Sequence, residues 1–238
     1  MKVSFIIPAH NEADYIERTL RSVHRAARDL GMPYEVIVVD DSSSDDTASI
    51  AERCDARVVH VACRQIAAAR NAGARAATGE LFVFVDADTE ISAQVMGAVV
   101  TAVGAGSVGG GSRFRFDGRI PAYGKCMQAF ASTVYPIARL ASGCFLFCTR
   151  DAFEAVGGFD ETRYAAEEAI MSRALRRHGR FVIVRPAVTT SGRKLRAYRG
   201  REMLAMAAGL VRARKVGQRR DGLDVWYGER RTDPEPPN

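Results

Sequence analysis

The 238-residue chain has few cysteines and no long hydrophobic run. Its five cysteines are odd in number, contain no C-x-x-C pair and mostly lie among apolar residues, so we expect reduced thiols rather than disulfides or a zinc site. No stretch approaches the about 18 apolar residues that a membrane span requires. Met1-Lys2 leads directly into an apolar strand pattern, unlike a signal peptide. These absences predict a cytoplasmic chain without a spanning helix.

The first ninety residues alternate between apolar strand patterns and helical patterns, which is typical of βαβ units in a parallel sheet. Asn11 is a candidate N-cap of the first helix, and Gly31 is the residue expected to stop it. A further strand is expected at 143–148. The expected strands in the first part are 3–7, 36–39, 58–61 and 81–85, and the expected helices are 13–30, 45–53 and 65–77. The fold class is therefore α/β.

Two carboxylates, Asp86 and Asp88, follow the most apolar short run of the chain, residues 81–85. Such a run is typical of a strand covered on both faces, and an unpaired buried carboxylate is costly, so we expect both acids to be exposed at the strand's end. Residues i and i+2 of a strand point to the same side. Both carboxylates could therefore bind one Mg²⁺ or Mn²⁺. Taken alone, the pair fits a solvated turn better.

Three polar loops follow strands of the expected sheet: 8–12, 40–42 and 86–88. Because the carboxyl ends of parallel strands meet at one edge of a sheet, these loops are expected to border one crevice. Asp41 could accept hydrogen bonds from a base or a ribose, His10 could contact a flat base, and Arg70 could face a phosphate. This chemistry suits a nucleoside diphosphate with a divalent metal.

At this point the chain resembles the family-2 glycosyltransferases, which have the GT-A fold. The matching stretches span about residues 3–184 and include FIIPAHNE, VIVVDDSSSDD, ARNAGARAATGELFVFVDAD, GGFDE and AEEAIMSRALRRHGRF. The resemblance implies a Rossmann-like, mostly parallel sheet flanked by helices in a single domain. It also implies an inverting enzyme that uses a nucleotide-sugar donor and Mn²⁺ or Mg²⁺.

The resemblance also implies roles for single residues. Asp86 and Asp88 match the family's Asp-x-Asp motif, with Asp88 on the metal and Asp86 on the ribose or on the metal through water. Asp41 would hold the base, and Asp160 is a secondary candidate for a sugar hydroxyl. The implied nucleotide-sugar site comprises Pro8, Ala9, His10, Glu12, Asp41, Arg70, Asp86, Ala87, Asp88, Gly143 and Asp160.

The acidic pair Glu167-Glu168 matches the position of the family's general base. In relatives the second member is usually Asp; this chain has Glu168, which is longer but can carry the same proton. Which of the two is the base stays open at this point. The implied reaction is a single in-line displacement that inverts the anomeric carbon. Taken alone, the pair fits acids that oppose the dipole of a helix N-terminus better than it fits a catalytic base.

Other functions fit the sequence less well. The run 104–109 satisfies G-x-G-x-x-G, but a strand pattern follows it where a dinucleotide site needs a helix. A nucleotidyltransferase would want a glycine-rich, lysine-bearing loop after the first strand, which 8–12 is not. A non-catalytic nucleotide-sugar-binding or membrane-scaffolding protein with the same fold is the alternative, and Glu168 is its support.

The C-terminal part is strongly basic. We expect a catalytic domain at 1–192, with a nucleotide-binding half at 1–90 and an acceptor half at 91–192, and a basic amphipathic helix with a disordered tail at 193–238. The apolar stripe 203–211 packs on the sheet or, with 129–140, lies on a membrane surface. The acceptor is an unidentified hydroxyl compound, with a lipid-linked one among the candidates, and the localisation is cytoplasmic, at the inner membrane face if this helix binds lipid. No aromatic platform accompanies the charge, so nucleic acid is not an expected partner. The basic residues are Arg193, Lys194, Arg196, Arg199, Arg201, Arg212, Arg214, Lys215, Arg219 and Arg220.

Overall fold

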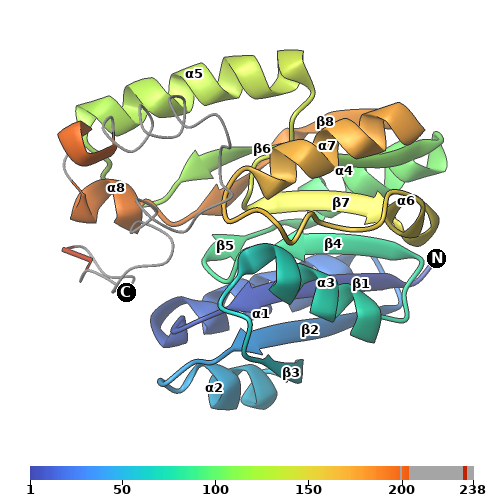
Figure 1. The fold of residues 1–238 in the computed structure, drawn as a ribbon, viewed down its shortest axis with the longest axis horizontal. Coiled ribbons are helices and arrows are strands. Elements are labelled where there is room, and N and C mark those ends of the chain that lie inside the picture. The colour runs from blue at the N-terminus through green and yellow to red at the C-terminus, as the bar shows by residue number, and fades with distance from the viewer. Residues whose placement is uncertain (199, 204–232, 235–238) are drawn as a thin grey trace.

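The computed structural model describes residues 1–198, 200–203 and 233–234. They form one eight-stranded sheet with the strand order β3-β2-β1-β4-β7-β6-β8-β5, flanked by helices on both faces (Figure 1). The predicted α/β class is confirmed. The amphipathic stripe expected after residue 203 and most of the tail lie outside the described residues.

The bounds of the elements follow the chain order. The strands are β1 (Val3–Ala9), β2 (Tyr34–Asp41), β3 (Arg57–Val61), β4 (Leu81–Val85), β5 (Thr89–Glu90), β6 (Ser107–Phe116), β7 (Phe145–Thr149) and β8 (Arg180–Thr190). The helices are α1 (Ala13–Asp29), α2 (Thr47–Arg53), α3 (Ile66–Ala76), α4 (Ala93–Gly104), α5 (Ala122–Ala138), α6 (Arg150–Ala155), α7 (Glu167–His178) and α8 (Arg193–Ala197).

The four strands β3, β2, β1 and β4 are parallel. Strand β7 runs antiparallel to both of its neighbours, β4 and β6, while β6 and β8 are parallel. The start of β7 therefore lies beside the end of β4, where Val85 pairs with Phe145. This reversal brings residues 142–144 to the edge at which β1, β2 and β4 end.

The core consists of one layer on each face of the sheet. On one face, α1 and α4 cover the alternate side chains of the strands, with Phe5, Ile16 and Phe147 fully buried. On the other face, α3, α6 and α7 cover Ile6, Phe82 and their neighbours. Because both faces are covered, the strands are almost continuously apolar, which is why β4 has the bounds that its sequence predicted.

The start of α1 differs from the expectation. Asn11 is not the N-cap: it has φ = 52°, and its side-chain oxygen accepts a hydrogen bond from Ser44 N at 2.8 Å. Loop 42–47 satisfies the free backbone groups instead, because Glu12 N donates to Thr47 Oγ1 at 2.7 Å and Ala13 N donates to Asp45 at 3.1 Å. The loops after β1 and β2 are thereby bound together. Gly31, with φ = 58°, follows the helix as expected.

The glycines that resembled a dinucleotide fingerprint serve the sheet. Gly104 ends α4, and Gly109 to Gly111 lie inside β6. A Cβ atom on Gly110 would lie 2.1 Å from the carbonyl oxygen of Val182 on β8. The close approach of the strands therefore requires glycine there, and no phosphate site is needed to explain the motif.

Candidate active site

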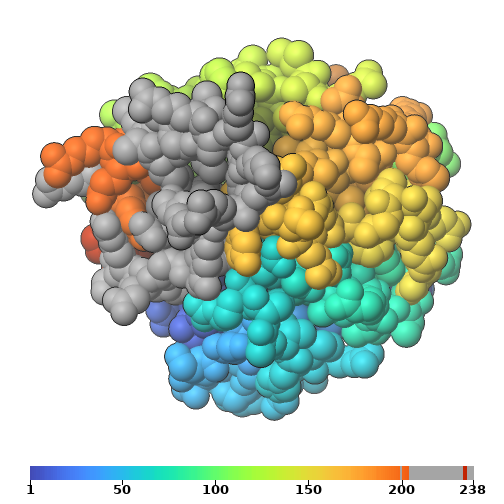
Figure 2. Space-filling view, in the orientation of Figure 1, coloured from blue at the N-terminus to red at the C-terminus, as the bar shows by residue number. Residues whose placement is uncertain are grey.

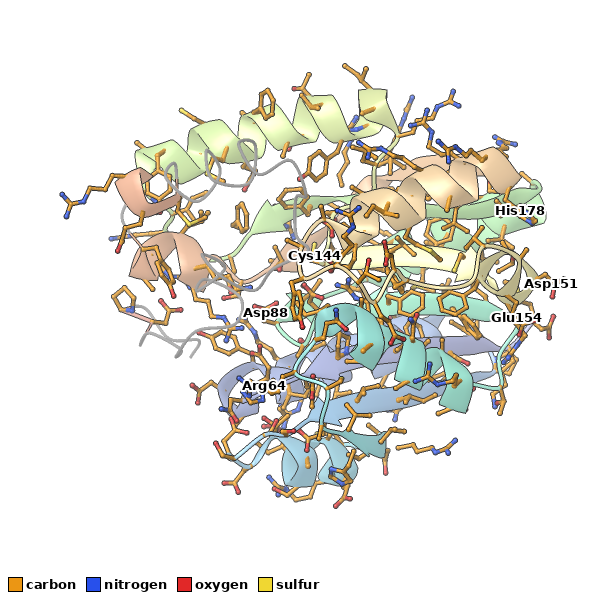
Figure 3. The ribbon with its side chains drawn as sticks, in the orientation of Figure 1. Arg64, Asp88, Cys144, Asp151, Glu154 and His178 are labelled. Atoms are coloured by element: carbon orange, nitrogen blue, oxygen red, sulfur yellow. The ribbon has the colours of Figure 1, made fainter. Side chains whose placement is uncertain are left out.

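A cavity of about 360 Å³ lies at the carboxyl ends of β1, β2 and β4. Apart from Asp160, all twelve nucleotide-sugar and catalytic candidates line the cavity. Three come from the ends of β1 and β2, six from three loops, and three from α3 and α7. Figure 3 shows Asp88, Cys144 and Arg64 on this side of the sheet. The lining comprises Pro8, Ala9, His10, Glu12, Asp41, Arg64, Gln65, Ile66, Ala69, Arg70, Asp86, Ala87, Asp88, Tyr135, Gly143, Tyr164, Ala165, Ala166, Glu167, Glu168, Arg193 and Lys194.

Asp41, at the end of β2, holds the loop that leads into α3. Its Oδ1 accepts hydrogen bonds from Cys63 N at 3.0 Å and Arg64 N at 2.8 Å, and its Oδ2 accepts one from Gln65 N at 3.0 Å. The Cys63 thiol donates a weaker one to Oδ2 at 3.3 Å. His10 Nδ1 lies 2.8 Å from the carbonyl oxygen of Asp41, and the Arg64 guanidinium contacts the same ring. Asp41 therefore shapes this corner of the cavity through the backbone of residues 63–65.

Arg70, on α3, is buried at the centre of the site. It donates to Glu167 Oε1 at 2.8 Å, to Asp86 Oδ1 at 3.0 Å and to the carbonyl oxygen of Gly143 at 2.8 Å. Burial opposes the charge of Arg70, but Asp86 and Glu167 raise its pKa, so it remains a cation. The sequence suggested that Arg70 faces a phosphate. Its hydrogen bonds tie the Asp-x-Asp loop to the acidic pair, and its contact with a phosphate stays a prediction.

The sequence predicted that both acids of the motif are exposed. For Asp88 this is wrong, because the residue is buried. Only 8% of it is accessible, and its Oδ2 lies 3.0 Å from Nη2 of Arg193. The same nitrogen lies 2.7 Å from Glu12 Oε1, and the guanidinium stacks 4.3 Å from the centre of the Tyr15 ring. Burial disfavours the charge of Arg193, but Asp88 and Glu12 raise its pKa above the ordinary value. This cation makes the burial of Asp88 tolerable.

The other carboxylate of the motif, Asp86, is partly exposed and points to Arg70. Burial raises its pKa to about 6, against the lowering influence of Arg70. Between the two acids, Ala87 is buried, and its carbonyl oxygen accepts a hydrogen bond from Thr19 of α1 at 2.8 Å. The two carboxylates thus lie in one cavity, each beside a buried arginine.

The acidic pair at the start of α7 divides into two different environments. Glu167 is 6% exposed and is bound to Arg70. Glu168 forms no ion pair with the described residues, and its carboxyl group lies 3.7 Å from where a Cβ atom on Gly143 would be. Burial and the neighbouring charge of Glu167 raise the pKa of Glu168 to about 8. Glu168 is thus the member of the pair with its carboxyl group available in the cavity.

Asp160 lies outside the cavity, so the structure does not support its expected contact with a sugar. Its carboxylate accepts hydrogen bonds from Thr162 N and Oγ1 at 3.0 and 2.6 Å, and Arg163 lies beside it at 3.5 Å. The Asp160 loop is held to α3 by Asn71, which accepts from Phe159 N and donates to Phe159 O, both at 2.9 Å. The loop therefore has a structural role next to the site.

Several lining residues were not predicted as site residues: Arg64, Gln65, Tyr135, Tyr164, Arg193 and Lys194. Arg193 and Lys194 were visible only as part of the basic C-terminal cluster. Both belong to α8, so the expected domain boundary after residue 192 passes through the wall of the cavity. Nothing in the sequence indicated that Glu12 and Asp88 are buried. Had their burial been known, a cation partner for them could have been expected, because buried acids need one.

The cavity fits a divalent metal that is shared with a ligand. Among the described residues, no three His, Cys, Asp or Glu side chains are grouped as metal ligands. Asp86 and Asp88 supply hard oxygen atoms, which suit Mg²⁺ or Mn²⁺ when phosphate oxygens and water complete the shell. Asp88 would have to exchange part of its contact with Arg193 for the metal.

A family comparison decides the assignment. The model of glycosyl transferase family 2 matches residues 4–157, well over half of the chain. The chain belongs to this family. A dolichol-phosphate mannosyltransferase of Pyrococcus furiosus is 31% identical over 179 residues, which are 71% of this chain and 48% of that protein. An undecaprenyl-phosphate 4-deoxy-4-formamido-L-arabinose transferase of Klebsiella pneumoniae is 37% identical over 98 residues, 37% of this chain and 29% of that protein. The chain thus spans half or less of these relatives.

Solved structures of two other enzymes show the same fold. A mannosyltransferase of Pyrobaculum calidifontis in complex with GDP-Man and Mn²⁺ has a TM-score of 0.66 and 22% identity, covering 87% of this chain and 61% of that one. A glucosyl-3-phosphoglycerate synthase of Mycobacterium tuberculosis in complex with Mn²⁺ and UDP has a TM-score of 0.62 and 20% identity, covering 97% and 81%. The predicted GT-A fold is confirmed.

Proposed function

We propose that this chain transfers a sugar from a nucleoside diphosphate sugar to a hydroxyl acceptor, with inversion, by a metal-assisted single displacement. The observation that carries the proposal is the placement of two elements in one cavity: the Asp86/Asp88 pair at the end of β4, and Glu168 at the start of α7. Donor complexes of structural relatives, one with GDP-Man and Mn²⁺ and one with UDP-GlcNAc, support the donor class.

The donor would lie across the ends of β1, β2 and β4. Pro8, Ala9 and His10 would border the nucleoside. Asp41 would accept a hydrogen bond from the base in place of the weak one from the Cys63 thiol, because the other three hydrogen bonds to Asp41 come from backbone N–H groups. Asp86 and Asp88 would hold Mn²⁺ or Mg²⁺, which neutralises the charge of the leaving diphosphate. Arg193 and Lys194 of α8 add positive charge on the same side of the cavity.

Glu168 is the group that we assign as the general base. A base must be free of a permanent cation partner, must reach the acceptor hydroxyl and should have a pKa near the working pH. Glu168 meets the first condition among the described residues, and burial raises its pKa to about 8. Glu167 instead keeps Arg70 in place and is a positioning residue. Gly143 leaves room beside the Glu168 carboxyl group for the acceptor.

Tyr135, Tyr164 and Glu168 line the cavity, and we assign the acceptor to the side on which Glu168 lies. An acceptor oxygen that attacks from this side would lie opposite the diphosphate, as in-line displacement requires. The names of the curated relatives, both polyprenyl-phosphate glycosyltransferases, make lipid-linked acceptors the first class to screen. Action at the inner face of a membrane, by a catalytic domain centred on residues 1–192, is part of this proposal. In the described residues, no helix has the length and apolar character for crossing a bilayer.

Calorimetric titration of UDP, GDP and dTDP, with Mn²⁺ and with EDTA, tests the donor site. We expect one nucleotide to bind only with metal, and Asp88→Asn to abolish that binding. Asp151→Asn is a matched control and should bind normally, because Asp151 lies at the other end of the molecule from Asp88 (Figure 3). Absence of binding by all three nucleotides would contradict the proposal and favour a protein that keeps the fold without the chemistry.

A further inference from the structure

Helix α5 turns its apolar side away from the protein. Of the large hydrophobic side chains that are exposed in the described part of the chain, three of five lie on this helix: Met127 at 43%, Phe130 at 68% and Ile137 at 78%. With 3.6 residues per turn, these three share one stripe of about 100° with Cys126 and Val134. The stripe contains no charged residue. The helix forms the upper edge of the molecule in Figures 1 and 2.

The opposite side of α5 faces the protein and is less apolar. Gly124 is buried there, Gln128 accepts a hydrogen bond from Phe116 N at 3.1 Å, and Tyr135 lines the cavity. A surface helix normally buries its apolar stripe and exposes its polar side. In α5 this arrangement is reversed, so core packing does not explain the stripe. An exposed apolar patch of this kind marks a contact with a partner.

Positive charge surrounds the stripe. Helix α5 has one charged residue, Lys125, and no acid. Beside its C-terminal end, Arg176 of α7 donates to the carbonyl oxygen of Ala138 at 2.7 Å. Figure 3 shows nitrogen-tipped side chains gathered between this end of α5 and α7. At the other end of the helix, near Tyr123, the acid Glu202 adds negative charge. The exposed cations of α5, of the loops that flank it and of α7 are Arg119, Lys125, Arg139, Arg173, Arg176 and Arg177.

We propose that α5 docks this protein on a bilayer that contains anionic phospholipids. The outward stripe would enter the boundary between head groups and acyl chains, and the flanking cations would contact lipid phosphates. The helix is about 25 Å long at 1.5 Å per residue and would lie flat on the surface. A second copy of the chain is a poorer occupant, because a symmetric contact would bring the same cations together.

This contact would place the cavity at the membrane surface. Tyr135 borders the cavity from the inner side of the same helix whose outer side carries Phe130 and Ile137. The proposal is independent of the transferase chemistry, because it rests on the surface of α5 alone. The sequence suggested a membrane contact through the apolar stripe 203–211 together with 129–140; the present proposal rests on α5 alone, which includes most of 129–140.

Sedimentation of the full chain with vesicles tests the proposal. We expect binding to vesicles of phosphatidylcholine with phosphatidylglycerol and much weaker binding to phosphatidylcholine alone. Phe130→Glu and Ile137→Glu should each lower the partition coefficient at least tenfold, because each removes a large inserted side chain. Leu30→Glu, a control at an exposed leucine (38% accessible) after α1, should bind like the wild type.

The cations provide an independent measurement. Arg173→Gln and Arg177→Gln should each weaken binding about fivefold, and only to vesicles with phosphatidylglycerol. Melting temperature and nucleotide binding should be unchanged in all these variants, which shows that they fold. Full vesicle binding by the Phe130→Glu/Ile137→Glu double variant would overturn the proposal, as would conversion of a wild-type dimer to a monomer by this variant without a change in vesicle binding.

Discussion

Replacing Glu168 by glutamine should stabilise the protein while removing its transferase activity. The folded chain holds the Glu168 proton up to about pH 8, whereas the unfolded chain releases it near pH 4.5. Unfolding therefore releases a proton between these values, and the free energy of unfolding falls as the pH rises through this window. Glutamine has the shape of the neutral carboxyl group but does not ionise. The free energy of unfolding of Glu168→Gln should therefore exceed that of the wild type by an amount that grows with pH and levels off above about pH 8.

The magnitude follows from the two pKa values. Each pH unit between them corresponds to about 1.4 kcal/mol, which sets an upper bound of about 5 kcal/mol. Water at the cavity mouth and relaxation around Glu168 lower this to on the order of 2 kcal/mol. For a chain of this size, that difference raises the melting temperature by about 4–8 °C at pH 9.

Thermal unfolding in EDTA at pH 5.5, 7 and 9 measures this difference. Glu154→Gln is the matched control: the side chain is 62% exposed and lies 3.6 Å from Arg150 in a surface pair, so its effect should be small at every pH. A Glu168→Gln variant that is less stable than the wild type at pH 9, or whose advantage does not grow with pH, would refute the assignment of a buried, raised-pKa carboxyl group to Glu168.

Three further predictions concern other charged groups in and beside the cavity. Glu167→Gln should lower stability by about 3 kcal/mol in urea unfolding, opposite in sign to Glu168→Gln, because it removes one of the two carboxylates that neutralise the buried Arg70; an equal effect of both variants would contradict the division of roles. Arg193→Gln should lower the melting temperature, and Mn²⁺ should raise it more than in the wild type, since Asp88 no longer shares its carboxylate with the Arg193 guanidinium; Arg196→Gln on the same helix is the control, and an equal rise in both variants would count against this. Asp160→Asn should leave metal-dependent nucleotide binding intact, as measured by calorimetry, because Asp160 faces Thr162 rather than the cavity.

The parts of the site that were predictable from sequence are those that the strand order determines. The run 81–85 is apolar because both faces of β4 are covered, and Asp86 and Asp88 follow directly. Loops after parallel strands share one edge of the sheet, so the convergence of residues 8–12, 41 and 86–88 required no contact information. The position of Glu168 depended on the family resemblance rather than on pattern, because acids are common at helix starts.

The contacts that the sequence did not predict join residues far apart in the chain. Arg193 is 181 residues from Glu12, and their pairing depends on the path of β8 past β6. Arg70 carries the charge expected of a phosphate ligand, but the tertiary structure turns it toward Glu167 and Asp86. The exposed stripe of α5 was visible only as a modestly apolar segment, because periodicity alone does not show which side of a helix faces the protein.

The central claim is that Glu168 activates a hydroxyl group for inverting displacement on a donor held by Asp86 and Asp88. Once calorimetry has identified the nucleotide, proton NMR of its α-linked sugar donor with the enzyme and metal tests this claim, with water as the acceptor at early time points. The account predicts that the β-anomer of the free sugar appears first with the wild type. It also predicts a rate at least a hundredfold lower for Glu168→Gln, which should still bind the donor. Initial release of the α-anomer, or an undiminished rate for Glu168→Gln, would contradict it.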